Sequence, residues 1–375
     1  MPRAPWCSAP RGGSCRARSR SPSEQGNPRV FRVGYLDHVP HQAFLDTAAQ
    51  EPLLEVVRIG LDQPEAAVIA ALDRCHAYYV MASRDELPRP FHVHAELLAR
   101  LPKLLMVASY GAGYDTIDPD ACTDAGVLLC NQAGGNAEGV AEHAVGMMLA
   151  LLKRMPEATA AMRAGRARDR VALMGRELRG RTVGLVGIGH VGTRVAEICR
   201  LGFSCRVIAC DPYLDADVVA ARGAEKVEMD RLLAESDVVS LHLPLTGESR
   251  DLMNAGTFAR MRRGAIFVTT SRGSIHNEPA LHGALASGHL GGAGLDVWEQ
   301  EPPPPDHPLL SLDNVILTQH TAGVTHESRA NITRIAALGF AEAAHGRLPP
   351  RVINRAVVPR FAARWADAFG RPLVV

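Results

Sequence analysis

Residues 180–213 read GRTVGLVGIGHVGTRVAEICRLGFSCRVIACDPY, a stretch in which three glycines separate a short apolar run from a helical pattern. Residues 183–186 are typical of a buried strand. Gly187 permits a tight turn, Gly189 lets the backbone approach a pyrophosphate, and Gly192 lets the following helix pack closely on the strand. The N–H groups at the start of that helix bind phosphate. The stretch therefore predicts a dinucleotide site.

An aspartate follows the second apolar run of this stretch. Asp211 stands nineteen residues after Gly192, directly after the run CRVIAC. A carboxylate at this place accepts hydrogen bonds from the adenosine ribose and repels a 2′-phosphate. We therefore predict NAD as the cofactor in preference to NADP. The alternative interpretation is a glycine-rich turn with an unrelated surface aspartate.

On both sides of this stretch, short apolar runs alternate with helical patterns. This alternation predicts an α/β protein built from doubly wound parallel sheets. The helical pattern at 136–155 is apolar on more than one face, which predicts a helix buried between domains or subunits. The chain divides into two similar α/β halves that meet near residues 130–136. The strands expected outside the opening stretch are 30–37, 77–83, 104–111, 126–132, 237–244, 264–271, 292–298 and 314–320.

The composition narrows the classes of protein. With 41 basic and 40 acidic residues, the chain has a formal net charge of +1, so neither nucleic acid nor an anionic membrane is an expected partner. We find no apolar run long enough to span a membrane and no secretory signal. The eight cysteines show no CxxC pair, which predicts free thiols, no metal site and a cytoplasmic location. Residues 1–29, rich in Pro, Ser, Arg and Gly, are expected to form a disordered leader.

Three ionisable residues follow expected strands of the second half. Arg272 comes after the run 264–271, Glu301 precedes four prolines in the loop after 292–298, and His320 ends the run 314–320. Ligands of parallel sheets bind outside the carboxyl ends of the strands, so these side chains are expected to converge. Arg272 suits a substrate carboxylate and His320 suits proton transfer. The alternatives are a structural ion pair for Arg272, a solvated carboxylate for Glu301, and a structural role for His320.

The chain resembles the D-isomer-specific 2-hydroxyacid dehydrogenases. The matching stretches occur in the family's order between residues 31 and 354. They are ASYGAGYDTIDP, NAEGVAEHAVGMMLAL, GRTVGLVGIGHVGTRVA, SDVVSLHLPLTGESRDLMN, TTSRGSIHNEPAL, GAGLDVWEQEP and HTAG. The resemblance implies a Rossmann-like coenzyme domain at 131–323 and a discontinuous substrate domain at 30–130 and 324–354. Residues 355–375 are then a C-terminal surface tail.

The resemblance also implies roles for particular residues. It assigns catalysis to Arg272, Glu301 and His320, with a hydride exchanged between NAD(H) and a small 2-oxo or D-2-hydroxy acid. The substrate carboxylate is expected at the backbone amides of Ala112 and Gly113, beside Arg272. Further cofactor contacts are expected at His190, Val191, Leu243, Thr270, Asp296, His320 and Gly323, in addition to Gly187, Gly189, Gly192 and Asp211. Members of the family are typically homodimers that associate through the long helix and the coenzyme domain.

The substrate is narrowed by departures from the family pattern. The run VMASRDEL lacks a basic residue where phosphoglycerate-specific members often have one, although Arg84 could substitute. We therefore expect glyoxylate or hydroxypyruvate, with phosphoglycerate as a possible alternative. Tyr114 replaces a small residue; it could narrow the substrate end of the site, but we expect it to pack in the core between the domains. NAD-sensing co-repressors share the fold and the three ionisable residues, so an interaction protein is the competing hypothesis.

Overall fold

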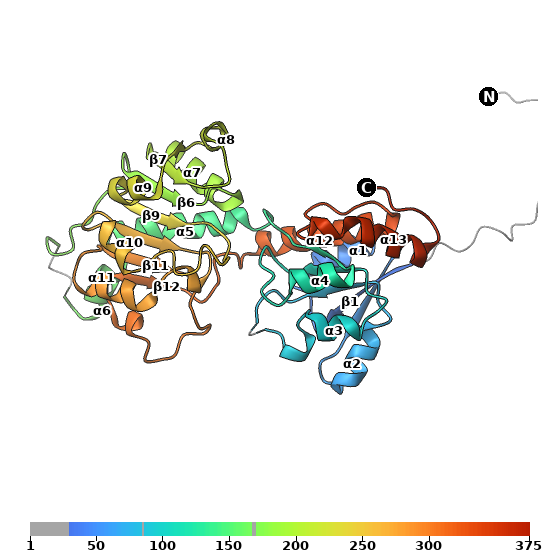
Figure 1. Cartoon of the computed structure of the whole chain (residues 1–375). Coiled ribbons are helices and arrows are strands. Elements are labelled where there is room, and N and C mark those ends of the chain that lie inside the picture. Colours follow the sequence, from blue (N-terminus) through green and yellow to red (C-terminus); the bar gives the residue numbers. More distant parts are fainter. Residues whose placement is uncertain (1–29, 85, 167–169) are drawn as a thin grey trace, which may run out of the picture.

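The computed structural model describes residues 30–84, 86–166 and 170–375, so the leader predicted at 1–29 lies outside the described residues. The chain folds into two lobes, each built around one sheet (Figure 1). The strands are β1 (Phe31–Leu36), β2 (Leu54–Ile59), β3 (Ala77–Val80), β4 (Met106–Ser109), β5 (Leu128–Cys130), β6 (Thr182–Val186), β7 (Arg206–Cys210), β8 (Glu225–Lys226), β9 (Val238–Leu241), β10 (Ile266–Thr269), β11 (Gly292–Leu295) and β12 (Val315–Leu317).

Helices connect these strands and cover the faces of both sheets (Figure 1). Most of these helices form the crossover connections that parallel strands need, because a tight hairpin cannot join two parallel strands. The α-helices are α1 (Ala43–Ala48), α2 (Glu65–Leu72), α3 (Ala95–Ala99), α4 (Pro119–Ala125), α5 (Ala137–Leu152), α6 (Met155–Arg163), α7 (His190–Phe203), α8 (Ala216–Ala221), α9 (Met229–Glu235), α10 (Ala255–Arg260), α11 (Glu278–Ala286), α12 (His326–His345) and α13 (Val358–Phe369).

Both sheets are parallel throughout. The five-stranded sheet has the order β2-β1-β3-β4-β5, and the seven-stranded sheet has the order β12-β11-β10-β9-β6-β7-β8. The strand order reverses beside β1 in the first sheet and beside β6 in the second, and such points open a crevice for ligands. The prediction of an α/β fold with two parallel sheets is confirmed.

The register of the seven-stranded sheet aligns the ends of its central strands. Leu241 at the end of β9 lies opposite Val186 of β6 and Thr269 of β10, and Thr269 lies opposite Leu295 of β11. Leu295 in turn lies opposite Leu317 of β12. The loops that follow these residues therefore start along one edge of the sheet, which is where the predicted functional residues stand.

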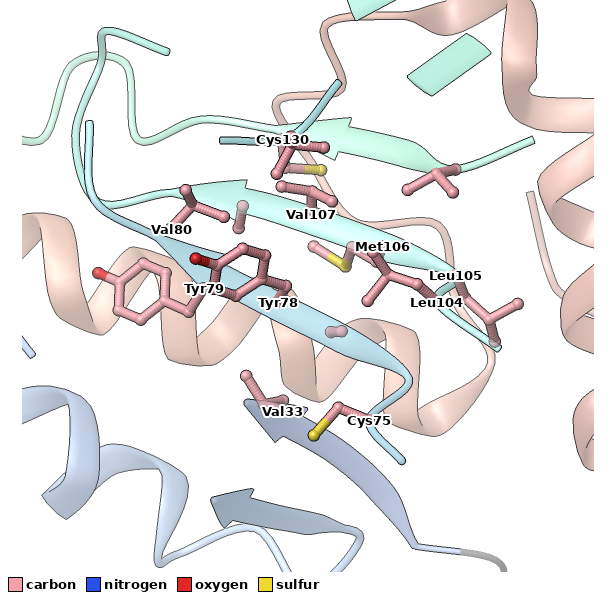
Figure 2. Close-up of a cluster of buried hydrophobic side chains, with 14 of the residues drawn as sticks. Val33, Cys75, Tyr78, Tyr79, Val80, Leu104, Leu105, Met106, Val107 and Cys130 are labelled. Atoms are coloured by element: carbon pink, nitrogen blue, oxygen red, sulfur yellow. The ribbon is translucent and has the colours of Figure 1, made fainter. Parts of the chain in front are cut away.

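The core of the five-stranded lobe is formed by apolar side chains of its strands. Figure 2 shows Tyr78 and Tyr79 of β3 beside Met106 and Val107 of β4. Because helices cover both faces, successive residues of these strands are all buried, and they read as continuous apolar runs. Phe340 of α12 joins this core from the other end of the described chain.

The C-terminal segment differs from the expected surface tail. Residues Val358–Phe369 form α13, and its Phe361 and Trp365 are fully buried in the core of the five-stranded lobe. The Trp365 indole N–H donates a hydrogen bond to the carbonyl of Ala343. The prediction was wrong because the arginines of this segment were given more weight than the spacing of four between its two large aromatic residues, which places them on one helix face.

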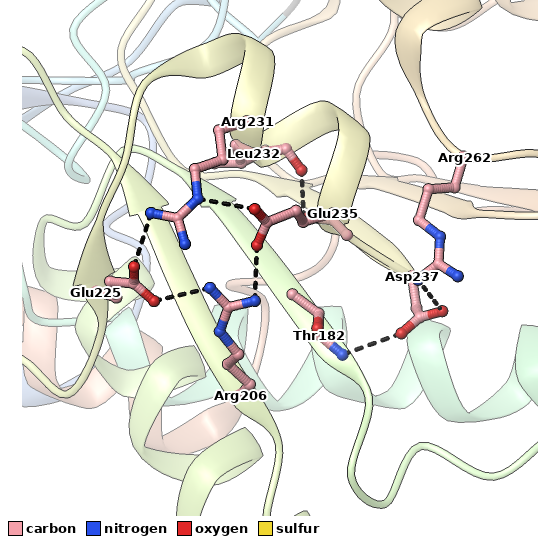
Figure 3. A network of polar contacts seen from close by, with 9 residues as sticks. Thr182, Arg206, Glu225, Arg231, Leu232, Glu235, Asp237 and Arg262 are labelled. Carbon is pink, nitrogen blue, oxygen red and sulfur yellow. Dashed lines mark hydrogen bonds and ion pairs between the residues drawn. The ribbon is translucent and has the colours of Figure 1, made fainter.

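An ion-pair ring lies at the surface near the β8 edge of the seven-stranded sheet. Arg206 and Arg231 each bridge Glu225 and Glu235, as Figure 3 shows. The four side chains are between 35% and 47% exposed, so solvent screens each pair and each contributes little stability. Asp237 is less exposed and accepts hydrogen bonds from the Thr182 backbone N–H and from Arg262.

No helix in the described residues is both long and apolar enough to cross a membrane.

A buried histidine in the seven-stranded lobe lacks polar partners. His276, 2% exposed, follows a short 3₁₀ turn (Gly273–Ile275), and neither of its ring nitrogens has a hydrogen-bond partner in the described structure. Its ring lies 5.9 Å from that of Phe267. Burial lowers the pKa of His276 to about 4, because the charged imidazolium would lose its hydration.

We predict that His276 makes the protein acid-sensitive. The unfolded chain binds a proton near pH 6.5 and the folded chain only near 4, so stability falls as pH drops between these values, by about 3 kcal/mol in total. The substitution His276→Leu should therefore raise the free energy of unfolding at pH 5 by more than it does at pH 8. Urea titrations at both pH values measure this, with His282→Gln on α11 as the control for loss of a ring. An equal gain at both pH values would contradict the prediction.

Candidate functional site

The aligned strand ends of the seven-stranded sheet face a cavity between the lobes. Its volume is about 520 Å³. The five-stranded lobe contributes the loops after β3, β4 and β5 and part of α12, and the seven-stranded lobe contributes the loops after β6, β9, β10, β11 and β12. The cavity brings together most of the residues that the sequence singled out: Ala112, Gly113, His190, Val191, Leu243, Thr270, Arg272, Asp296, Glu301, His320 and Gly323.

The glycine turn has the geometry that a dinucleotide phosphate needs. Gly187 has a φ of +85°, and a Cβ atom there would lie 2.6 Å from the carbonyl oxygen of His242, so only glycine fits. Gly189 is the N-cap of α7, and a Cβ atom on it would meet open space. The first N–H groups of α7 have no acceptor within the helix. A Cβ atom on Gly192 would lie 2.5 Å from the Gly187 carbonyl oxygen, so α7 packs tightly on the turn.

The carboxylate of Asp211 is fixed beside this turn. Asp211 follows β7, and its Oδ2 accepts the backbone N–H of Ile188 at 3.1 Å while its Oδ1 accepts that of Tyr213 at 3.1 Å. The guanidinium of Arg222, at the C-terminal end of α8, donates to the Ile188 carbonyl at 2.6 Å. Asp211 and Arg222 thus flank Ile188, the residue between Gly187 and Gly189. A carboxylate in this position fits an NAD cofactor whose adenosine ribose lies beside it.

Arg272 both lines the cavity and makes an ion pair. Its Nε donates to Oδ2 of Asp115 at 3.1 Å, and its Nη1 donates to the Ser271 carbonyl at 2.7 Å. Arg272 therefore makes an ion pair, as the structural alternative expected, and it also lines the cavity. The remaining N–H groups are those of the two terminal nitrogens, which form the fork that suits a carboxylate.

His320 and Glu301 form a hydrogen-bonded pair at the cavity. Nδ1 of His320 lies 2.8 Å from Oε2 of Glu301, and the backbone N–H of Trp298 donates to Oε1 of the same carboxylate at 3.1 Å. Because an ionised carboxylate only accepts hydrogen bonds, Nδ1 carries the proton and Nε2 is left for another partner. Glu301 is therefore held in place by two hydrogen bonds and does not behave as a solvated loop residue.

The pKa values of this pair are shifted in opposite directions. Burial acts to lower the pKa of His320, but the hydrogen bond and the charge of Glu301 outweigh it and raise the pKa above the ordinary histidine value. Burial acts to raise the pKa of Glu301, whereas the hydrogen bond and the charge of His320 lower it below the ordinary range. The pair therefore favours an imidazolium beside a carboxylate, and the imidazolium is an acid available near neutral pH.

Asp296 braces the loop that carries the imidazole. Its carboxylate, 1% exposed, accepts the Thr318 hydroxyl at 2.6 Å and the backbone N–H groups of Thr321 and Ala322 at 2.8 and 2.9 Å. Its carbonyl accepts the His320 N–H at 2.6 Å, which holds His320 in a left-handed conformation with φ of +56°. The sequence placed Asp296 at the cofactor, and the structure adds this bracing role, which no local pattern could reveal.

The loops after β10 and β11 touch through a glycine. A Cβ atom on Gly273 would lie 1.9 Å from the carbonyl carbon of Trp298, so any side chain at this position would collide with the neighbouring backbone. Arg272 precedes this contact and Glu301 follows it three residues after Trp298. The two loops are therefore packed as one unit.

Two other histidines, His143 and His326, were further candidates for proton transfer, and the structure places them and Tyr114 as follows. His143 on α5 contacts the Thr318 hydroxyl at 3.1 Å, so it lies behind the loop of His320. His326 is the first residue of α12 and is exposed, outside the residues that line the cavity. Tyr114 packs against the core of the five-stranded lobe and also lines the cavity, so both of its expected positions are partly realised.

Part of the chain matches the model of a known protein family. Residues 145–322 match the model "D-isomer specific 2-hydroxyacid dehydrogenase, NAD binding domain". Over 269 residues the chain is 39% identical to a glyoxylate reductase of Korarchaeum cryptofilum, covering 71% of this chain and 81% of the relative. It is 40% identical over 259 residues to a D-3-phosphoglycerate dehydrogenase of Archaeoglobus fulgidus, covering 69% of this chain but only 49% of that relative.

Solved structures with the same architecture include two dehydrogenases. The apo D-mandelate dehydrogenase of Rhodotorula graminis aligns with a TM-score of 0.76 and 27% identity, covering 87% of this chain and 98% of that structure. The D-lactate dehydrogenase of Aquifex aeolicus, complexed with NAD and lactic acid, aligns with a TM-score of 0.71 and 28% identity, covering 84% of this chain and 96% of that structure.

Proposed function

Because the chain belongs to the D-isomer-specific 2-hydroxyacid dehydrogenase family and carries its NAD-binding domain, we propose that it interconverts glyoxylate or hydroxypyruvate with the corresponding 2-hydroxy acid. The observation that supports this most is the His320–Glu301 pair, 2.8 Å apart, in the same cavity as Arg272. The chain spans 81% of the glyoxylate reductase but only about half of the phosphoglycerate dehydrogenase.

In the proposed reaction, this chain's residues bind the substrate and move one proton. The free fork of Arg272 and the backbone N–H groups of Ala112 and Gly113 hold the substrate carboxylate beside the imidazole. Bound NAD(H) supplies or accepts the hydride. For reduction, Nε2 of protonated His320 donates a proton to the substrate oxygen, and Glu301 stabilises the charged imidazolium before that transfer. For oxidation, neutral His320 takes the proton back.

The cofactor is proposed to lie across the carboxyl edge of the seven-stranded sheet. The start of α7, with His190 and Val191, faces its phosphates, and Asp211 faces its ribose. Leu243, Thr270, Asp296 and Gly323 also line the cavity. The Thr270 hydroxyl is buried without a partner in the described structure, so it is available to a ligand.

We also propose that the lobes act as a substrate domain (30–130 and 324–354) and a coenzyme domain (131–323), and that two chains form a dimer. The exposed apolar residues on and after α6 support the dimer: Met155, Met162, Val171 and Met174. Light scattering on the purified protein should give twice the mass of one chain. A monomer at micromolar concentration would rule the dimer out.

The proposed function is tested with a panel of 2-oxo acids. Glyoxylate, hydroxypyruvate, pyruvate, oxaloacetate and phosphohydroxypyruvate are each mixed with enzyme and NADH, and the loss of NADH absorbance is followed. We expect the highest kcat/KM for glyoxylate or hydroxypyruvate. Preference for phosphohydroxypyruvate would move the assignment to the phosphoglycerate branch, and no turnover with any 2-oxo acid would reject the proposed reaction.

We predict that Asp211 sets the preference for NADH over NADPH. The substitution Asp211→Ala removes the charge that repels a 2′-phosphate and leaves Arg222 nearby, so the NADPH-to-NADH ratio of kcat/KM should rise by about 10- to 100-fold. The control Asp217→Asn removes an exposed carboxylate on α8 and should leave the ratio unchanged. If the unmodified protein uses both cofactors equally, the role given to Asp211 is wrong.

A further inference from the structure

We propose that Asp115 is a positioning residue for Arg272: its carboxylate holds Nε so that the terminal nitrogens of the guanidinium face the cavity. This inference rests on the proposed function, in which that fork binds the substrate carboxylate. Asp115 belongs to the loop after β4 of the five-stranded lobe, whereas Arg272 follows β10 of the seven-stranded lobe. The ion pair therefore crosses from one lobe to the other.

The contacts of Arg272 with the described residues leave N–H groups of its two terminal nitrogens without an acceptor. Nε is taken by Asp115 at 3.1 Å, and one N–H of Nη1 is taken by the Ser271 carbonyl at 2.7 Å. A Cβ atom on Gly113 would lie 1.9 Å from Nη2, so Nη2 rests directly against that backbone. A guanidinium with five N–H groups in a fixed plane is oriented once two of them are bound. Without Asp115, only the Ser271 carbonyl would orient it.

The loop that carries Asp115 is itself fixed. The backbone carbonyl of Asp115 accepts a hydrogen bond from Nε of Arg84 at 2.9 Å. The side-chain amide of Asn131 donates to the Ala112 carbonyl at 2.7 Å. The Ser109 hydroxyl donates to the Gly113 carbonyl. These contacts hold the loop at three of its residues, so the Asp115 carboxylate is a fixed reference point from which Arg272 is aligned.

Charge and position predict opposite effects of removing Asp115. A carboxylate beside Arg272 repels a substrate carboxylate, so by Coulomb's law alone its removal should strengthen substrate binding. The Asp115 and Arg272 side chains are 38% and 26% exposed, and solvent weakens that repulsion. Loss of alignment instead weakens the two-bond contact, because reacting groups displaced by about 1 Å can lose about a hundredfold in rate. The sign of the change in KM separates the two effects.

The test compares Asp115→Ala and Asp115→Asn with the unmodified enzyme. We expect Asp115→Ala to raise KM for the 2-oxo acid and to lower kcat/KM by about 10- to 100-fold. Asp115→Asn keeps an acceptor oxygen and should restore part of the loss. The Kd for NADH and the pH limb set by His320 should not move, because Asp115 contacts neither α7 nor the imidazole in the described structure. Asp120→Asn, an exposed acid of α4, is the control for net charge.

Binding of oxamate, an unreactive 2-oxo acid analogue, is measured in parallel by tryptophan fluorescence with NADH present. Weaker oxamate binding in Asp115→Ala, with normal NADH binding, supports the inference even if no tested 2-oxo acid is turned over. A lack of turnover would reject the proposed reaction but not the positioning role, which oxamate binding tests by itself. Tighter oxamate binding, a lower KM, or values equal to those of the unmodified protein would overturn the positioning role.

Discussion

Replacing Arg272 with lysine is expected to lower kcat/KM for the 2-oxo acid by about one to two orders of magnitude. Lysine keeps the positive charge but has neither the Nε that meets Asp115 nor the two-nitrogen fork. A charge-assisted hydrogen bond contributes about 1.5–3 kcal/mol, and each 1.4 kcal/mol corresponds to about tenfold in rate. The Kd for NADH should stay nearly constant, because the predicted phosphate contacts lie at α7. Steady-state kinetics and NADH fluorescence titration measure the two quantities.

Another arginine of the cavity provides the control for this result. Arg329 of α12 also lines the cavity and makes no side-chain hydrogen bond or ion pair with the described residues. If Arg329→Lys gives the large loss while Arg272→Lys supports near-normal turnover, the substrate carboxylate binds at α12 and not at the end of β10. The proposed clamp would then be wrong, although the NAD-binding part of the site would stand.

Replacing Glu301 with glutamine is expected to move the pH dependence of the reaction to lower pH. The Glu301 charge and hydrogen bond raise the pKa of His320 above its ordinary value, against the effect of burial. Glutamine keeps the size of the side chain and removes the charge, so burial then lowers the pKa of His320. Reduction needs protonated His320, and its alkaline limb should shift downward by about one pH unit or more, equal to about 1.4 kcal/mol per unit.

The same substitution is checked in the opposite direction of the reaction. Oxidation needs neutral His320, so its acid limb should also move to lower pH, by the same amount. Glu299→Gln removes an exposed carboxylate two residues away and should leave both limbs in place. If both limbs of Glu301→Gln coincide with those of the unmodified enzyme, Glu301 does not act on His320 in solution.

Much of the fold and part of the site follow from local sequence. Strand–glycine–helix order places Gly187, and the rule on carboxyl ends brings Arg272, Glu301 and His320 to one cavity, because each lies just after a buried strand. Contacts between lobes could not be predicted in this way. Asp115 stands 157 positions before its partner Arg272, and no periodic pattern links residues so far apart.

Three other features also depend on contacts between residues that are distant in the sequence. Asp296 gains its bracing role only because three hydrogen-bond donors of the following strand's loop fold back onto it. The burial of Trp365 depends on where α13 lies against the five-stranded lobe, which its arginine-rich composition concealed. His276 is a polar residue, yet tertiary packing buries it, and no local sequence pattern indicates that burial.

The glycine contact at Gly273 has a consequence for engineering the range of substrates. Since the loops of Arg272 and Glu301 are packed backbone to backbone there, a library of substitutions in either loop would disturb proton transfer and anion binding together. The opposite wall of the cavity, with Ser83 and Tyr114, comes from a different lobe and meets these loops through the Arg272 side chain, at Gly113 and Asp115, and not backbone to backbone. Directed evolution for larger 2-oxo acids should therefore accumulate its useful changes on that wall, while the two catalytic loops stay under purifying selection.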